Sequence, residues 1–490
     1  MTRSALLACG AAALFACGCL GPGYKRPPVP VPSAYRLPTP GGASLATWHW
    51  WRVFGDKQLQ ELIRIALEEN KDLKIAVARI DEYWARVGFT RADYLPRVDA
   101  RVFRARAKAS GDVAPPGLTT SDLRAAGELS WEIDLWGKLH RATDAARADL
   151  LASEANRRAV VNKLMADVAS AYLELRSLDW RREIAVDTLK GRTQNTALIR
   201  KRFSGGIVAE VDVLQAEREE AKAAASIPEL DRQVTQKENE LSILIGRAPG
   251  PIVRGERLAD RPVLPDVPAG LPAELLARRP DIVRAEQELI AQHYRVQYAK
   301  GQCFPTFSLT GAGGTQSDHL RRLLHAGTSI WSLGATLVAP VVAFKKNRRR
   351  VQIEQAKARQ LAHAYESAAL QAFREVNDAL VAIRTYRDQR VEVERQIAAS
   401  RKALRLSQMR WEGGVVNYLE VLDSQRQLFD AQLLSADILK AQLVSAVQLY
   451  KALGGGWPDV VAVEASKPGG PPLRTGPPGP PRAVPPGPEP

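Results

Sequence analysis

Cysteine is scarce in this chain of 490 residues, and its placement excludes a disulfide framework. Cys9, Cys17 and Cys19 fall near the N-terminus, and only Cys303 lies in the body of the chain, so no bridge across the body is expected. Long apolar runs are missing too. Beyond the N-terminal segment no stretch of about 18 apolar residues occurs, which excludes a membrane-spanning helix. Any membrane crossing must therefore use β-strands.

Recognisable catalytic and metal-binding motifs are also missing. The histidines are scattered, and the sequence contains no HExxH, CxxC, GxSxG, Walker or GxGxxG pattern. The adjacent carboxylates Glu219 and Glu220 are expected on the solvated face of a helix, where they have no catalytic use. We therefore predict no catalytic, cofactor-binding or metal-ligating residues, and a protein that is not an enzyme.

Basic residues outnumber acidic ones and give a formal net charge of +15. They are spread along helical stretches without interleaved aromatic residues, which favours a solvated surface and gives no reason to expect a nucleic-acid partner. One concentrated basic run, Phe344–Arg350, stands where a predicted strand meets a predicted helix. It either faces lipid phosphates or is solvated.

The N-terminus has the pattern of a secretory signal. Arg3 is followed by the apolar run Ala5–Ala16, which is too short to span a membrane, and then by small residues and cysteine. We predict a lipoprotein signal peptide over residues 1–18, with Cys19 as the lipid anchor and Cys17 as the alternative. The anchor would carry S-diacylglycerol and N-palmitoyl groups, and no other cofactor is expected. An ordinary secreted protein with incidental cysteines is the other interpretation.

The rest of the chain consists of two similar halves between segments rich in Pro and Gly. Arg202–Val208 aligns without gaps with Arg410–Val416, and nearly the same offset pairs many other positions. Each half is expected to contain helix, strand, loop, strand, long helix, Gly-Gly turn and helix. The predicted boundaries are 19–46 for an extended lead segment, 47–255 and 256–457 for the two repeats, and 458–490 for a disordered tail.

Helical periodicity runs without interruption through the long segments of both halves. Leu164, Val168 and Ala171 recur at spacings of three and four residues, as in helices packed side by side. No proline occurs from Lys138 to Phe203, so a helix of roughly 65 residues, about 100 Å long, is predicted there. A compact domain needs no such rod.

Four segments have the alternating pattern of a half-buried strand. Apolar and polar residues alternate in 98–102, 129–135, 306–311 and 331–337. Loops over 107–122 and 312–328 are expected at exposed tips. The pattern also suits a soluble sheet, but the lipoprotein signal and the long helices favour a membrane barrel. Because four strands cannot close a barrel and about eight are needed, the chain is expected to oligomerise, and three copies would give twelve strands.

These features occur together with a series of short motifs. In order they are Gly21–Pro27, Trp50–Asp56, Trp131–Gly137, Leu276–Ile282 and Ala452–Trp457. Together they resemble the outer membrane efflux protein family (the TolC superfamily), in its lipoprotein branch of NodT or OprM type, from about Cys19 to Trp457. The resemblance implies α-helices plus a transmembrane β-barrel: a homotrimer with a twelve-stranded outer-membrane barrel continued by a long periplasmic α-helical barrel.

The resemblance also implies a function and partners. Members of this branch conduct drugs or other small toxic compounds passively to the cell exterior, from an RND-type inner-membrane pump and a periplasmic adaptor. The chain is then expected in the outer membrane of a Gram-negative bacterium, anchored in its lipid. An outlet for type I protein secretion or for metal efflux with the same fold is the alternative, and a soluble coiled-coil interaction protein is the interpretation from another class.

Site residues follow from the same resemblance. Leu419 and Asp423 match the family's periplasmic gate, and their i, i+4 spacing puts them on one helical face. Without the resemblance, Leu419 would be interpreted as ordinary core and Asp423 as a solvated charge. The turns at Gly205–Gly206 and Gly413–Gly414 resemble the tips that contact the adaptor.

Overall fold

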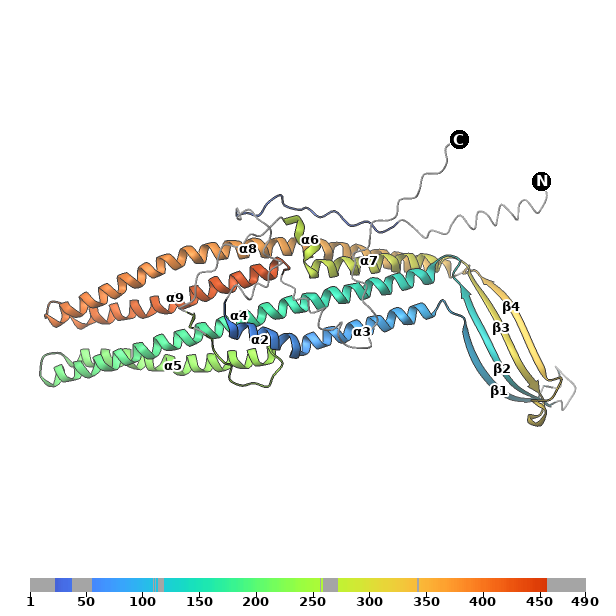
Figure 1. The fold of residues 1–490 in the computed structure, drawn as a ribbon, viewed down its shortest axis with the longest axis horizontal. Helices are drawn as coiled ribbons and strands as arrows, with labels where there is room; N and C mark the ends of the chain where they lie inside the picture. Colours follow the sequence, from blue (N-terminus) through green and yellow to red (C-terminus); the bar gives the residue numbers. More distant parts are fainter. Residues whose placement is uncertain are drawn as a thin grey trace, which may run out of the picture.

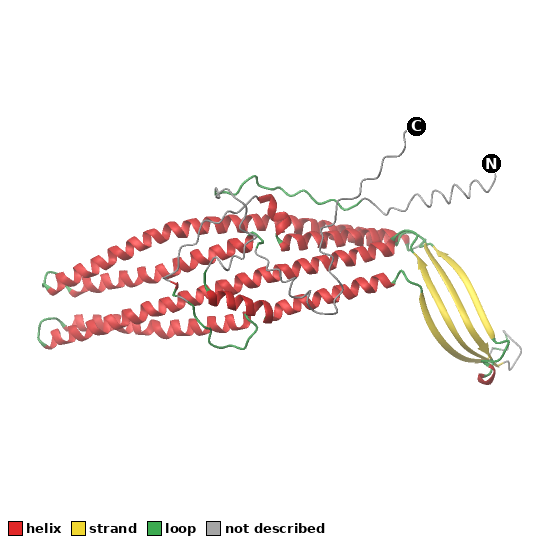
Figure 2. Cartoon of the chain, viewed as in Figure 1, coloured by secondary structure: helices red, strands yellow, loops and turns green. Residues whose placement is uncertain are grey.

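The molecule is elongated, with long helices at one end and a curved sheet at the other (Figure 1). The computed structural model describes residues 23–37, 55–108, 110, 112, 119–255, 257–258, 272–341 and 343–455. Figure 2 shows that the strands lie beyond one end of the helices and do not pack among them. The fold therefore has two parts of different character.

Both halves of the chain contribute the same series of elements. The first half contains α2 (Lys57–Glu69), α3 (Lys71–Ala92), β1 (Arg97–Lys108), β2 (Thr119–Ile133), α4 (Lys138–Ser204) and α5 (Glu210–Leu244). The second half contains the 3₁₀ turn η4 (Pro272–Glu274), α6 (Leu275–Arg278), α7 (Pro280–Gly301), β3 (Thr306–Ser317), the 3₁₀ turn η5 (Leu320–Arg322), β4 (Ser329–Val338), α8 (Phe344–Glu412) and α9 (Tyr418–Ala452). The order helix, two strands, long helix and returning helix thus occurs twice, as the internal repeat predicts.

The two longest helices define the length of the molecule. Helix α4 contains 67 residues and α8 contains 69, so each is about 100 Å long at 1.5 Å per residue. The uninterrupted helix predicted from Lys138 is confirmed, and it ends at Ser204. Helix α4 packs against α3, α5, α7 and α9, while α8 packs against α7 and α9.

Three buried clusters hold the helices together. The largest surrounds Tyr172 and joins α2, α4, α5 and α9. The second surrounds Tyr365 and joins α6, α7, α8 and the end of α9. The third lies near the far ends of the long helices and contains Ile199, Trp411 and Tyr418. Burial of these apolar side chains provides the main force that keeps the rods together.

The four strands form one antiparallel sheet in the order β1-β2-β3-β4. Directly opposed residues in such a sheet share a face, so the registers assign every side chain to one of two faces. The apolar face carries Val98, Ala100, Val102, Leu129, Trp131, Phe307, Leu309, Trp331, Leu333 and Leu337. The polar face carries Arg97, Asp99, Arg101, Glu128, Ser130, Glu132, Ser308, Thr310, Ser332 and Thr336. The alternation predicted from the sequence is therefore confirmed.

The loops between the strands are shorter than the sequence predicts. Strand β1 continues to Lys108, β2 begins at Thr119 and β3 continues to Ser317. These residues fall within the segments whose Gly, Ser and Thr content indicated loops. At Gly314 the reason is close approach, since a Cβ there would lie 2.1 Å from the carbonyl oxygen of Ala125. Glycine is needed there so that β2 and β3 can pair.

The predicted strand over 129–135 is also too long by two residues. Strand β2 ends at Ile133, and the Leu135 amide donates to the Ile133 carbonyl (2.9 Å) in the turn that leads into α4. Leu135 remains exposed. This local hydrogen bond ends the pairing of β2 with β3 at Ile133, although the alternation of apolar and polar residues continues to Leu135.

Part of the predicted lead segment is described and lies against the helices. Arg26 donates two hydrogen bonds of 2.6 Å to the carboxylate of Glu286 on α7, and Tyr35 is buried in the second cluster. The predicted signal peptide 1–18, both candidate anchors Cys17 and Cys19, and the tail 458–490 lie outside the described residues. Among the helices that the structure describes, none is long and apolar enough to cross a bilayer.

The close approach of β2 to Gly314 can be tested by comparing a substitution at Gly314 with the same substitution at Gly313. A Cβ at Gly313 would meet nothing within 4 Å. We predict that Gly314→Ala destabilises the protein by about 1–3 kcal/mol through overpacking, whereas Gly313→Ala has little effect. The measurement is thermal melting of the detergent-purified variants, followed by circular dichroism. Equal melting temperatures for the two variants would contradict the geometry.

Candidate functional site

The ends of the two helical hairpins lie together at the end of the molecule farthest from the sheet (Figure 1). Each hairpin turns with its second glycine in the left-handed region: φ is 68° at Gly206 and 72° at Gly414. Gly205 and Gly413 keep negative φ values. A positive φ thus occurs only at the second glycine of each pair, where a side chain would be strained.

Both turns present apolar side chains to solvent. After the first turn, Ile207 and Val211 are exposed, and after the second, Val415 is exposed. The two tips are joined behind these residues, because the Arg202 guanidinium stacks on the Trp411 ring of the other hairpin at 4.2 Å. The tips therefore form a single end surface with an exposed apolar component.

The predicted gate residues lie just beyond the second tip, in the first turns of α9. Leu419 is 48% exposed, and Asp423 is exposed and accepts a hydrogen bond from Gln427 (2.6 Å). With Asn417, Glu420 and Arg426 they line an open depression of about 480 Å³. Leu419 is thus no part of the buried core, and the structure brings both residues to one surface as their spacing predicts.

The side of α9 opposite Leu419 packs against the first hairpin and holds this helix in place. Tyr418, Val421 and Leu422 are buried against Ile199 and Val213 of the first hairpin. The Asn195 amide of α4 donates to the Tyr418 hydroxyl (2.5 Å), and burial raises the pKa of Tyr418 above its usual value. A neutral tyrosine therefore fixes the rotation of α9 and turns Leu419 outward.

A buried charge network crosses between the hairpins one to two turns deeper. Arg192 of α4 is 5% exposed, and its Nη1 donates to the backbone oxygen of Glu219 (2.6 Å). The Glu219 carboxylate, 4% exposed, lies 3.5 Å from Arg192 and 3.6 Å from Arg426 of α9. Burial lowers the pKa of the Arg192 guanidinium, and the Glu219 charge opposes that shift.

Sequence reasoning missed this network. The prediction that Glu219 and Glu220 lie on a solvated face is wrong for Glu219. Its position continues the spacing of Val213 and Ala216, both buried, so the signal was its phase on the helix. A carboxylate in a core position is retained when cations pair with it.

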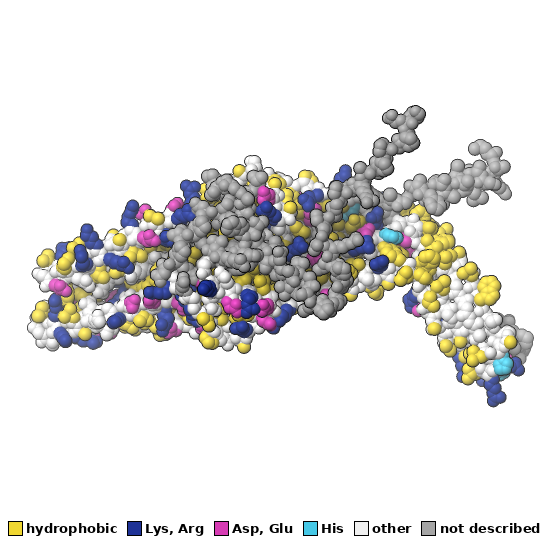
Figure 3. Space-filling model, in the orientation of Figure 1, with side chains coloured by type: hydrophobic (Ala, Val, Ile, Leu, Met, Phe, Trp, Pro, Cys, Tyr) yellow, Lys and Arg dark blue, Asp and Glu magenta, His cyan; other side chains and the backbone are white. Residues whose placement is uncertain are grey.

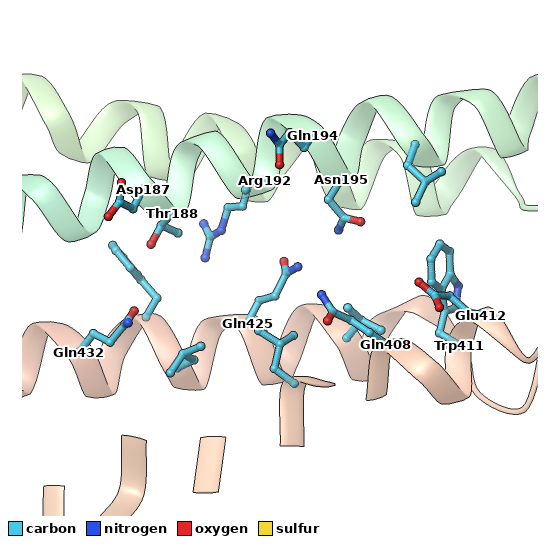
Figure 4. A pocket seen from close by; sticks show the side chains of 16 residues that line it. Asp187, Thr188, Arg192, Gln194, Asn195, Gln408, Trp411, Glu412, Gln425 and Gln432 are labelled. Atoms are coloured by element: carbon cyan, nitrogen blue, oxygen red, sulfur yellow. The ribbon is translucent and has the colours of Figure 1, made fainter. Parts of the chain in front are cut away.

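Polar side chains also line a cavity of about 490 Å³ between the hairpins. In Figure 4, Thr188, Arg192 and Asn195 of α4 face Gln425 and Gln432 of α9 across the gap. The contact between the two hairpins is therefore incompletely filled here, and polar side chains share its lining with apolar ones such as Leu198 and Phe429.

In the described ranges no group of three or more His, Cys, Asp or Glu side chains is placed to hold a metal ion. The geometry offers an end surface, an outward-facing pair formed by Leu419 and Asp423, and a partly polar contact between the hairpins behind them.

The comparisons agree with this geometry. A sequence profile of the family described as outer membrane efflux protein matches residues 62–247 and 271–455. The probable efflux pump outer membrane protein TtgC of Pseudomonas putida is 32% identical over 93% of this chain and 96% of its own length. The cation efflux system protein CusC of Escherichia coli is 30% identical over 92% of this chain and 98% of its own length.

A solved structure shares the fold over nearly its whole length. The open state of the Neisseria gonorrhoeae MtrE outer membrane channel superposes with a TM-score of 0.79 at 30% identity, covering 89% of this chain and 98% of that one. Helices, sheet and tips are thus similar to those of an outer membrane channel. The chain belongs to the outer membrane efflux protein family, whose members are the outer-membrane channels of tripartite efflux pumps.

Proposed function

We propose that three copies of this chain form a passive outer-membrane channel, which receives drugs or other small toxic compounds from an RND-type pump and a periplasmic adaptor. The observation that carries the proposal is the sheet: four strands, a face that is apolar over the half nearer the helices, and unpaired edges at β1 and β4. Neither edge has a partner among the described residues.

The unpaired edges of β1 and β4 require the chain to assemble with other copies. An unsatisfied backbone group in hydrocarbon costs several kcal/mol, and each edge presents a row of such groups. Four strands are too few to close on themselves, since the smallest membrane barrels have about eight. Pairing β1 of one copy with β4 of the next closes a ring, and three copies give twelve strands.

In such a barrel the apolar face of the sheet contacts lipid and the polar face lines the lumen. Trp331 and Leu333, which are 83% and 78% exposed, face the lipid, and the polar face with Glu128 and Thr310 lines a water-filled lumen. Figure 3 shows that, on the visible side of the sheet, charged side chains gather at the two ends and hydrophobic or uncharged ones lie between. This is the pattern of an outer-membrane barrel wall.

The helices continue the same tube into the periplasm. Rods of about 100 Å are long enough to meet an adaptor far from the membrane. At their ends, the turns at Gly205–Gly206 and Gly413–Gly414 present exposed apolar residues such as Ile207 and Val415. These tips are the surface that we assign to the adaptor.

Leu419 and Asp423 form the proposed periplasmic gate. Three copies of Leu419 around the axis would make an apolar constriction, and three copies of Asp423 a ring of like charges that binds cations. Opening requires α8 and α9 to move away from α4, and the polar cavity between the hairpins lies on the interface that must part.

The gate can be tested against a matched pair on the same helix. We predict that Leu419→Ala combined with Asp423→Ala raises single-channel conductance in planar bilayers, because the narrowest rings are removed. Asp430 and Leu434 have the same residue types and spacing, are exposed, and lie farther from the tip; replacing both with Ala should leave conductance unchanged. Equal conductance for wild type and the Leu419/Asp423 variant would remove the gate assignment.

The lipid anchor is proposed at Cys19. Supporting it, the chain from Gly23 onward is held against the helices, with the Arg26 guanidinium paired to the Glu286 carboxylate. An acylated residue a few positions earlier adds a second attachment to the membrane.

Acylation at Cys19 predicts a simple labelling result. Cys19→Ala should abolish incorporation of labelled palmitate, whereas Cys17→Ala should leave a labelled mature protein. Persistent labelling of the Cys19→Ala protein would move the anchor to Cys17.

The cargo is proposed as drugs and other toxic organic compounds. The relatives are named for cation, solvent and antibiotic efflux at similar identities of 30–34%, so similarity alone does not select among them. A metal-efflux outlet remains the second candidate because of the resemblance to CusC.

The phenotype of a strain in which the gene is deleted distinguishes between these two classes of cargo. We predict that the deletion strain becomes sensitive to several unrelated antibiotics, dyes or solvents, and that the wild-type gene restores resistance. Sensitivity confined to transition-metal salts would favour metal efflux, and unchanged sensitivities would contradict multidrug export.

A further inference from the structure

Three basic residues occupy the apolar face of β1 at its end farthest from the helices. Arg104 lies opposite Leu123, Arg106 opposite Ser121 and Lys108 opposite Thr119. All three are exposed. They continue the line of Val98, Ala100 and Val102 on the same face.

The sequence alone would place these side chains on the other face. After Val102 the alternation changes phase, because Phe103, Ala105 and Ala107 become the apolar members. A β-bulge would produce that change and turn the basic residues toward the lumen. The register excludes a bulge, since β1 pairs with β2 residue by residue from Arg97 to Lys108.

No carboxylate shares this face with them. The acidic residues of the strands, Asp99, Asp122, Glu128 and Glu132, all lie on the polar face. There they take other partners, as in the pair of Arg97 with Asp99 (2.8 Å) and of Arg101 with Glu128 (3.4 Å). Within the described ranges, Arg104, Arg106 and Lys108 form no ion pair.

The neighbouring copy in the proposed trimer would not supply one from its strand. Strand β4, which would pair with β1, has the sequence SIWSLGATLV and contains no acid. The strands of the proposed barrel therefore supply no carboxylate to balance these charges.

Their depth also fits a membrane surface. Arg104 and Lys108 lie six and ten residues beyond Val98, about 20 and 34 Å along the strand at 3.4 Å per residue. A strand tilt of about 40° makes these heights about 16 and 26 Å, so the basic residues reach the upper edge of an outer-membrane apolar band about 25 Å tall.

We propose that Arg104, Arg106 and Lys108 bind the phosphate groups of a phosphorylated glycolipid of the outer leaflet, of the lipid A type. The guanidinium groups hold a phosphate through paired hydrogen bonds, and the acyl chains lie along Val98 and Val102. This inference rests on the proposed barrel, because it takes the apolar face as the lipid-facing one.

The test measures lipid binding by the full-length protein purified in detergent. Lipid A is titrated and retained lipid is followed by native mass spectrometry. In the variant Arg104→Gln/Arg106→Gln/Lys108→Gln the apparent affinity should fall about a hundredfold, since each basic residue near an anionic lipid contributes roughly a factor of five. Arg97→Gln/Arg101→Gln, which removes charges from the polar face of the same strand, is the matched control and should bind like wild type.

Two further arms identify the ligand chemistry. Lipid A lacking its phosphates should bind the wild-type protein as weakly as intact lipid A binds the triple variant. Inorganic phosphate at millimolar concentration should not displace lipid A, because the acyl chains contribute to binding; displacement would identify a free-phosphate site instead. The charge-preserving variant Arg104→Lys/Arg106→Lys should retain most of the affinity.

Equal lipid A binding by wild type and the triple variant would overturn the inference. If the triple variant binds lipid A as the wild type does but its trimer melts at a lower temperature, the three basic residues form a contact between copies instead. Wild-type protein that is a conducting trimer but binds no lipid A would reject this site alone, whereas a wild-type monomer without conductance would reject the proposed function itself.

Discussion

Unpaired strand edges are the constraint on which the rest of the structure depends. A sheet with an apolar face can lie in hydrocarbon only if every backbone donor and acceptor is paired. Four strands in the order β1-β2-β3-β4 leave two edges open, and in the proposed trimer neighbouring copies pair them. Each half of the chain contributes two strands and a pair of long helices.

The helical part follows a different rule. Its elements are held by interdigitated apolar side chains within and between the hairpins, and a polar and charged contact is added between the hairpins near their ends. At the tips, Trp411 and Tyr418 pack tightly, while Arg192, Glu219 and Arg426 form a buried charged cluster. A charged cluster is directional and specific, and breaking it exposes groups that water can solvate. The molecule thus combines long helices with a partly polar contact between the hairpins near their ends.

Much of this fold could be predicted from the sequence, because its long helices and its strands each follow a regular pattern of apolar residues. Helical periodicity without proline indicated α4, and period-two alternation indicated the four strands. The strand ends could not be predicted. Gly314 has the composition of a loop residue, yet it serves the close approach of β2 to β3, which only the three-dimensional pairing reveals.

The site was predictable in part for the same reason. Leu419 and Asp423 share a face by their spacing alone, but the outward direction of that face depends on the buried Tyr418 and its contact with Asn195, 223 positions away. Glu219 resembles a surface carboxylate until Arg192 and Arg426 are placed beside it. The phase of Glu219 on its helix indicates burial, but its partners on distant elements leave no local signal.

Cross-linking of the two sheet edges tests the central claim most directly. With Cys303 replaced by Ser, one cysteine is placed at Ala100 on β1 and a second, in turn, at Trp331, Leu333, Ala335 or Leu337 on β4. If β1 of one copy pairs with β4 of the next in a closed trimer, oxidation of membranes gives, for at least one pair, a covalent ladder that ends at three chains. No cross-link at any position, or a ladder that stops at two chains or continues past three, would contradict it.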